Sequence, residues 1–81
     1  MTPQEIMDEI EKLENEILIQ NLDNIRYDPY NSLPSYVYIL NNILPNHREL
    51  INAFKKIGIT DKRIIADHMV RMLFHKKGTT L

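Results

Sequence analysis

Residue types that carry catalytic chemistry are sparse in this chain of 81 residues. Ser32 and Ser35 are the candidate serine nucleophiles, and no histidine lies near them in sequence. His68 and His75 share one helix face, but a rise of about 1.5 Å per residue places them about 10 Å apart. One metal ion cannot bind both, because its ligand bonds are only about 2 Å long. These residues predict no catalytic site, no metal site and no enzyme activity.

Two glycines and no cysteine exclude further kinds of site. A glycine-rich phosphate-binding loop needs more glycines than the chain has. Without cysteine there is no disulfide framework and no thiolate metal ligand. No apolar run approaches the roughly 18 residues of a membrane span, and no signal-peptide pattern opens the chain. We therefore expect a soluble, cytoplasmic protein that binds no cofactor and no membrane.

Charge divides the chain into two unlike halves, although the net charge is only −1. Residues 1–45 carry eight acids and two bases, whereas residues 46–81 carry eight bases and three acids. Such asymmetry indicates either an anionic partner or packing of the two halves on each other. The candidate contacts for nucleic acid or an acidic partner are Lys55, Lys56, Lys62, Arg63 and Arg71.

Helical periodicity predicts an all-α fold, a small four-helix domain spanning 1–81 with a long N-terminal helix and a C-terminal helical hairpin. A capping box of Thr2 and Glu5 begins the first helix. Asn46 and Thr60 are predicted caps of later helices, which Gly58 and Gly78 would end. The predicted helices cover about 3–25, 34–44, 47–57 and 61–77, with an ordered loop over 27–34.

The helix over 3–25 carries a narrow apolar seam at spacings typical of a coiled coil. Its residues are Ile6, Ile10, Leu13 and Ile17. Glu9, Glu14 and Glu16 flank this seam, so two copies packed through it would repel each other. The seam is therefore predicted to pack on something basic. That partner is one of the last two helices of the same chain, the same helices of a second subunit, or another protein.

The turn at residues 57–60 (Ile-Gly-Ile-Thr) joins two amphipathic helices and resembles the turn of a helix-turn-helix motif. The resemblance covers about 50–74. It implies a DNA-binding regulator whose helix over 61–77 enters the major groove. The chain departs from the motif at Asp67, where an apolar buried residue is expected.

The same helix has a second interpretation. Arg63, Asp67 and Arg71 follow one another at four-residue spacing, with Asp61 and His68 alongside. This spacing is typical of a ladder of ion pairs on a helix surface. Two aspartates on the face that would meet DNA also repel its phosphates.

All four tyrosines lie close together in sequence, at Tyr27, Tyr30, Tyr36 and Tyr38. Tyrosine is enriched at interface hot spots because it offers rigid apolar area together with a hydroxyl. The alternative is that these side chains pack the loop onto the domain. As a group beside Pro29 and Pro34, they are the predicted binding surface.

The helix over 61–77 is apolar around more than half of its circumference, so it must contact more than one neighbour. A chain of this length builds a small core, which a second chain can complete. The first hypothesis is therefore a non-enzymatic protein-binding regulator, inhibitor or adaptor that uses apolar helix faces and the Tyr/Pro loop. Its partner would be another protein or a second copy, as a homodimer. The alternative is a dimeric helix-turn-helix-like DNA-binding regulator.

Overall fold

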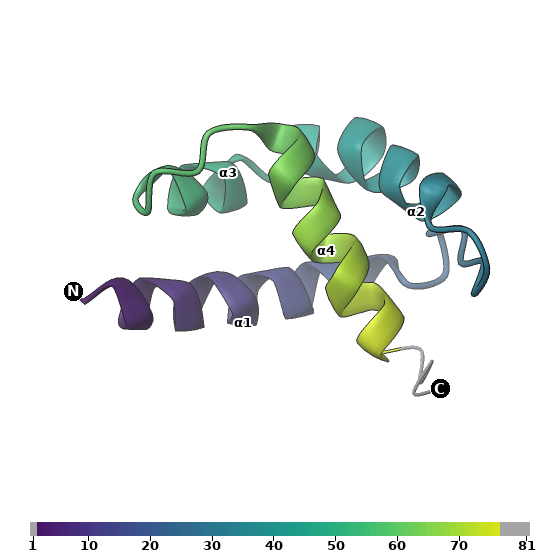
Figure 1. The fold of residues 1–81 in the computed structure, drawn as a ribbon, viewed down its shortest axis with the longest axis horizontal. Helices are drawn as coiled ribbons and strands as arrows, with labels where there is room; N and C mark the ends of the chain where they lie inside the picture. The colour runs from purple at the N-terminus through teal and green to yellow at the C-terminus, as the bar shows by residue number, and fades with distance from the viewer. Residues whose placement is uncertain (1, 77–81) are drawn as a thin grey trace.

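Four α-helices carry most of residues 2–76, the part of the chain that the computed structural model describes (Figure 1). No strand occurs among these residues, which confirms the all-α prediction. The elements in chain order are α1 (Pro3–Asn21), α2 (Leu33–Tyr38), the π-helix η1 (Ile39–Ile43), the 3₁₀ turn η2 (Leu44–Asn46), α3 (Arg48–Lys55) and α4 (Lys62–Lys76).

The long helix α1 lies along one side of the molecule, and α2 and α3 lie along the other (Figure 1). Helix α4 lies across both and contacts α1, α2, η1 and α3. Its apolar arc is buried against these neighbours at Ile65, Ala66, Met69, Val70 and Leu73. The prediction that α4 meets several neighbours is confirmed, and those neighbours belong to the same chain.

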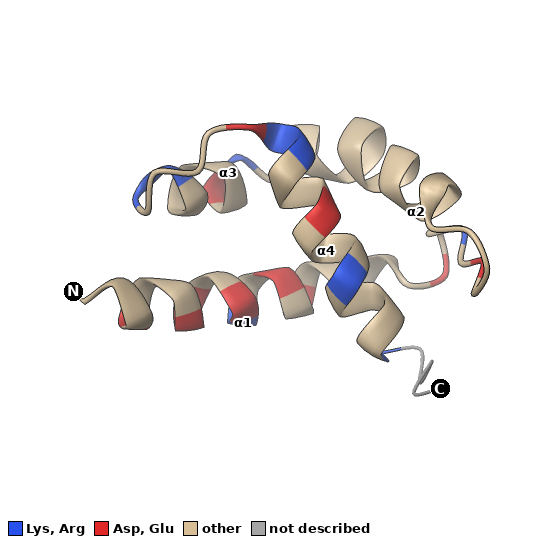
Figure 2. Ribbon diagram, viewed as in Figure 1, with Lys and Arg blue, Asp and Glu red and all other residues tan. Residues whose placement is uncertain are grey.

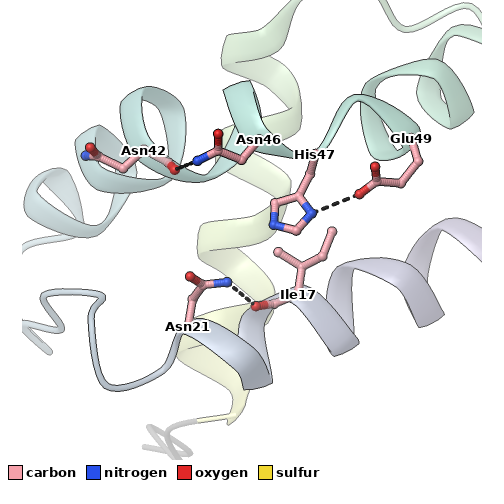
Figure 3. A network of polar contacts seen from close by, with 6 residues as sticks. All are labelled: Ile17, Asn21, Asn42, Asn46, His47 and Glu49. Carbon is pink, nitrogen blue, oxygen red and sulfur yellow. Dashed lines mark hydrogen bonds and ion pairs between the residues drawn. The ribbon is translucent and has the colours of Figure 1, made fainter.

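Helix α1 begins as predicted and ends earlier than predicted. The Glu5 N–H donates to Thr2 Oγ1 at 3.2 Å, and the Thr2 N–H donates to Glu5 Oε1 at 3.0 Å, which completes the capping box. The sequence predicts an end at Ile25, but the helix ends at Asn21. There the Asn21 side-chain amide donates to the Ile17 carbonyl oxygen at 2.8 Å (Figure 3), and the Asn24 and Ile25 N–H groups both donate to the Asn21 carbonyl.

The predicted helix over 34–44 is divided into α2, η1 and η2. The cause is Pro45, which has no N–H to donate and whose ring would clash with the carbonyl one turn earlier. The backbone widens before it, so that the Leu44 N–H donates to the Ile39 carbonyl, five residues back. The proline ring therefore changes the α-helix into a π-helix and then a 3₁₀ turn, while the backbone stays helical up to Asn46.

The predicted cap of α3 at Asn46 is wrong. The Asn46 side-chain amide donates instead to the Asn42 carbonyl oxygen at 3.0 Å (Figure 3). His47 occupies the N-cap position without a side-chain cap bond, and its Nδ1 lies 2.8 Å from Glu49 Oε1. Asn46 belongs to the preceding 3₁₀ turn, which uses its side chain before α3 begins.

Gly58 lies in the turn that ends α3, as predicted, but the helix itself stops at Lys55, two residues earlier than predicted. The Gly58 φ of 82° is a left-handed conformation that glycine adopts without strain. The Gly58 N–H donates to the Lys55 carbonyl and the Ile59 N–H to the Phe54 carbonyl, each at 3.0 Å. This bond pair is the Schellman motif, and it turns the chain sharply from α3 toward α4.

The predicted cap of α4 at Thr60 is wrong by one residue. Asp61 Oδ1 accepts the Arg63 N–H at 2.9 Å, so the carboxylate satisfies one of the free donors of the first turn. An acidic cap also suits the positive end of the helix dipole. The predicted end of this helix at Gly78 lies outside the described residues.

The core collects buried apolar side chains from α1, η1, η2, α3 and α4, and Tyr36 and Tyr38 of α2 pack partly buried against it. Its buried members are Ile10, Ile17, Leu18, Ile25, Ile39, Ile43, Leu44, Leu50, Ile51, Phe54, Ile65, Ala66, Met69, Val70 and Leu73. Glu14 and Ser35 are the buried polar residues among them. Within residues 2–76, no helix combines the length and the apolar character needed to cross a bilayer.

Candidate functional site

The apolar seam of α1 faces the interior. Ile10 and Ile17 are 0% and 2% exposed, and Ile6 and Leu13 pack partly buried against the same core. Helix α1 contacts α3 and α4 of its own chain, one of the packing partners considered from the sequence. Ile10 and Ile17 at the centre of the seam are therefore core residues in this fold, whereas Ile6 and Leu13 keep part of their surface exposed.

The four tyrosines have different environments. The Tyr27 ring packs against the Phe74 ring of α4, with centroids 5.0 Å apart and an interplanar angle of 59°. Tyr36 and Tyr38 are partly buried against the core. Tyr30 is 95% exposed. The structure thus assigns three tyrosines to packing, and Tyr30 alone lies fully at the surface.

Hydrogen bonds hold the loop that carries Tyr30. The Tyr30 N–H donates to Asp28 Oδ1 at 2.9 Å, and the Leu33 N–H donates to Asn31 Oδ1 at 3.1 Å. Both bonds span two residues, as in turns closed by Asp or Asn side chains. The loop therefore presents Tyr30 in a defined position.

Large apolar side chains continue from this loop onto α2. Leu33 is 59% exposed and Val37 is 43% exposed. Their four-residue spacing places them on one face of α2. Tyr30, Leu33 and Val37 are called the loop surface below.

A groove of about 530 Å³ lies between the loop and the second half of α4. Pro29 and Ser32 line it from the loop; Asp67, Val70, Arg71, Phe74 and His75 line it from α4. Two of its residues precede members of the loop surface directly in sequence. The groove combines apolar walls with a polar margin, where Arg71 and Asp67 form an ion pair of 3.1 Å. This combination is typical of pockets that accept an apolar group and orient it by polar contacts.

The groove also brings together Ser32, Asp67 and His75, the residue types of a hydrolytic triad. This grouping is not predicted from the sequence, because His75 is far from Ser32 along the chain. Within the described residues, however, no hydrogen bond joins Ser32 to His75, and Asp67 pairs with Arg71. The other candidate nucleophile, Ser35, is fully buried and donates from Oγ to the Arg26 carbonyl. Ser35 therefore fastens α2 to the preceding loop.

The predicted cationic contacts separate into two groups. Arg63 Nη2 lies 3.0 Å from Asp61 Oδ2, and the hydrogen bond from the Arg63 side chain is the main reason that the pKa of Asp61 is lowered. Arg71 pairs with Asp67 in the same way, four residues back along the helix. Both arginines on the outer face of α4 are thus accompanied by a carboxylate, as the ion-pair interpretation predicts.

Lys55 and Lys62 instead line a hollow of about 270 Å³ between α3 and the start of α4, together with Arg48, Ile51 and Asn52. Within residues 2–76, none of its three cations has an ion pair. In Figure 2, Lys and Arg mark the region of α3 and the first turn of α4, with acidic segments on α3 and directly before α4. Arg48 is not among the contacts predicted from the sequence, although its seven-residue separation from Lys55 places both on one side of α3. Lys56, also predicted as a contact, is exposed and does not line the hollow.

A buried acid joins α1 to α4. Glu14 is 0% exposed, and its Oε2 lies 2.7 Å from Nδ1 of His68. Its Oε1 has no hydrogen-bond partner among the described residues. Burial raises the pKa of Glu14; the hydrogen bond and charge of His68 oppose this shift, and the nearby Glu11 adds to it. The Phe54 ring meets the His68 ring edge-on at a centroid distance of 6.0 Å.

The sequence held a signal for this pair. Glu14 lies four residues from both Ile10 and Leu18, so it occupies the buried face of α1 and not only the flank of the seam. An acid at such a position needs a polar partner across the core. Periodicity alone did not identify His68 as that partner.

Within residues 2–76, no group of three His, Asp or Glu side chains could hold a metal ion. No family model, curated protein or solved structure matches the chain. The groove, the loop surface and the basic hollow are therefore interpreted from their own chemistry.

Proposed function

We propose that this protein is a non-enzymatic protein-binding module, a regulator, inhibitor or adaptor, that binds its partner through the loop surface and the adjoining groove. One observation carries the proposal: Tyr30, Leu33 and Val37 are 95%, 59% and 43% exposed on a segment held by hydrogen bonds, beside a core that is already closed. Leu33 and Val37 share one face of α2, and Tyr30 lies on the loop directly before it; contiguous exposed apolar surface favours contact with a partner.

The loop surface has the properties of an interface hot spot. Tyr30 offers a rigid ring and a hydroxyl, which together favour desolvated contact with a partner. Because the Asp28 and Asn31 side chains already fix the loop, binding orders few further backbone torsions.

The chemistry of the groove supports a partner of a particular kind. Pro29, Val70 and Phe74 provide apolar walls, and the Arg71–Asp67 pair provides a donor and an acceptor at the margin. We infer a partner segment that inserts one aliphatic or aromatic side chain and places polar groups over this pair. The groove then supplies selectivity, while the loop surface supplies apolar area.

Affinity capture from the native host with matched variants tests the proposal. The wild-type chain and Ile19→Ser should retain the same protein in stoichiometric amount, whereas Tyr30→Ala should weaken its binding at least about tenfold. Ile19 is the matched control because it is 55% exposed but lies on α1. Equal retention by Tyr30→Ala, or no stoichiometric protein in any sample, contradicts the proposal.

The identity of the partner as self or foreign is a separate measurement. The homodimer expected from the sequence loses part of its support, because the α1 seam and most of the α4 arc are covered within the chain. Light scattering at high micromolar concentration should give about 9.6 kDa if the partner is a different protein. Twice that mass, reduced to the monomer by Tyr30→Ala, would identify a second copy as the partner.

The alternative, duplex DNA binding by α4, has the turn at Gly58 in its favour. Against it, Asp67 is exposed where the motif expects a buried residue, and Arg63 and Arg71 are paired with aspartates. A gel-shift titration with duplex DNA at two salt concentrations should show no strongly salt-dependent complex. A complex that the double variant Lys62→Ala and Arg63→Ala weakens would restore the alternative.

A further inference from the structure

We propose that the basic hollow between α3 and α4 is a binding site for a small oligophosphate, an anion with two or more linked phosphoryl groups. The site consists of the Arg48, Lys55 and Lys62 cations, the Asn52 amide and the apolar side chain of Ile51. It lies on different residues from the loop surface and the groove, so it is independent of the proposed function.

The geometry of α3 places the cations around one depression. Arg48 begins α3 and Lys55 ends it, seven residues later and therefore about 10 Å away along the helix axis. Asn52 and Ile51 lie between them on the same side, and Lys62 faces them from the first turn of α4. The Schellman turn at Gly58 fixes this approach of the two helices.

The charge of the hollow is uncompensated. Its lining contains no acid, and its three cations have no ion pair among residues 2–76. By contrast, Arg63 and Arg71 on the same hairpin each have an aspartate within 3.1 Å. Three like charges around one depression repel one another, and a bound anion would relieve that repulsion.

The number of cations and the small size of the site favour a linked phosphate over other anions. A single carboxylate offers one charge to three cations, whereas linked phosphoryl groups offer several charges and acceptor oxygens. The lysines meet such a ligand as point charges, and Arg48 can donate two hydrogen bonds to one phosphoryl group. A hollow of about 270 Å³ suits a small ligand, while duplex DNA is read by elements that protrude into its grooves.

Calorimetric titration with inorganic triphosphate tests the site. Arg48→Gln, Lys55→Gln and Lys62→Gln should each weaken binding by about tenfold or more, because each removes one charge-assisted contact. Lys56→Gln is the matched control: it removes the same charge from the same helix end but does not line the hollow, so its affinity should change less than about twofold. All four residues are exposed, and thermal melts should show that each variant folds.

Four results would overturn the proposal. The first is no heat of binding at low salt, and the second is an equal loss of affinity in Lys56→Gln, which would indicate a diffuse positive field. The third is orthophosphate binding as tightly as triphosphate, which would show that linked phosphoryl groups are not required. The fourth is duplex DNA that displaces triphosphate and depends on the same three residues, which would assign the surface to nucleic acid. Tyr30→Ala should bind triphosphate normally, so failure here and failure of the protein-binding proposal are distinguishable.

Discussion

The ion pair on the inner face of α4 includes a buried side chain, whereas the ion pairs on its outer face are exposed to water. On the inner face, His68 meets Glu14, which is fully buried and lies 54 residues away along the chain. On the outer face, Arg63 and Arg71 pair with Asp61 and Asp67, two and four residues away, with the arginine side chains 74% and 78% exposed. The two faces have similar ion-pair distances, from 2.7 to 3.1 Å.

The difference between these faces is one of environment. A charge that is removed from water depends on its partner, because nothing else replaces its hydration. A charge that remains in water is screened and loses little when its partner is removed. The same pairing distance therefore predicts a large effect on the inner face and a small one on the outer face.

The largest expected effect is that of His68→Ala, which removes the partner of Glu14 Oε2. We expect the free energy of unfolding at pH 7 to fall by about 2–3 kcal/mol. This value lies below the range for fully buried pairs because the His68 side chain is 31% exposed. Urea denaturation followed by circular dichroism measures the loss. Glu14→Gln in the same background removes the buried charge, so it should recover part of the lost stability; a further loss would contradict this explanation.

The next expected effect concerns how the free energy of unfolding changes with pH. The contributions of Glu14 on the inner face and Asp61 on the outer face should change in opposite directions. The pKa of Glu14 is raised above its ordinary value of 4.5, so the folded protein binds the proton of this carboxyl group more tightly than the unfolded chain does. The resulting contribution to the free energy of unfolding is complete below pH 4.5 and is lost as the pH rises through the raised pKa. The wild type should therefore lose stability relative to Glu14→Gln as the pH increases above 4.5, by less than the loss in His68→Ala.

Asp61 on the outer face provides the matched control for this pH series. The pKa of Asp61 is lowered from 3.8. Its contribution to the free energy of unfolding is therefore present above pH 3.8 and is lost as the pH falls through the lowered pKa. The wild type should lose stability relative to Asp61→Asn on acidification. Urea titrations from pH 3 to pH 8 measure both differences, and slopes of the same sign in the two comparisons would refute the contrast.

A smaller effect is expected from Gly58→Ala, which changes the turn that sets the direction of α4. The cost should be about 1 kcal/mol, because alanine is strained at a φ of 82°. Apart from its two chain neighbours, no atom of residues 2–76 lies within 4 Å of an added Cβ, so contact with the rest of the fold adds nothing to this cost. Gly58→Asn should lose less, since asparagine tolerates the left-handed region better than alanine. Equal stability of Gly58→Ala and the wild type, measured by urea denaturation, would show that the turn is not strained.

The features predicted correctly from sequence are those that a few neighbouring residues determine. The Thr2–Glu5 capping box, the turn at Gly58 that ends α3 and the Asp67–Arg71 pair each involve groups within five residues of one another. The two wrongly predicted caps also depend on residues that are close together in the sequence. The Asn46 side chain bonds backward into the preceding turn, and Asp61 replaces Thr60 as the acceptor.

The features that sequence reasoning missed depend on which helix face meets which neighbour. Periodicity shows that Glu14 has a buried orientation, but only the packing of α1 on α4 places His68 against it. In the same way, the groove joins the loop at Ser32 to α4 at His75, and the hollow joins Arg48 to Lys62. Helix periods determine the orientation of a side chain on its own element, whereas tertiary contacts determine its partner.

The smallest effect is expected for the pair of Asp67 and Arg71 on the outer face. Asp67→Asn and Arg71→Gln should each change the free energy of unfolding by no more than about 0.5 kcal/mol, and a double-mutant cycle should give a coupling of similar size. Raising the salt concentration should reduce this coupling, because both side chains are more than half exposed and their attraction is screened. A coupling above about 1 kcal/mol would mean that the pair is shielded from water, as in an assembly that covers the groove. In that case the outer face would resemble the inner one, and the coupling would fall to the expected value on dilution to the monomer.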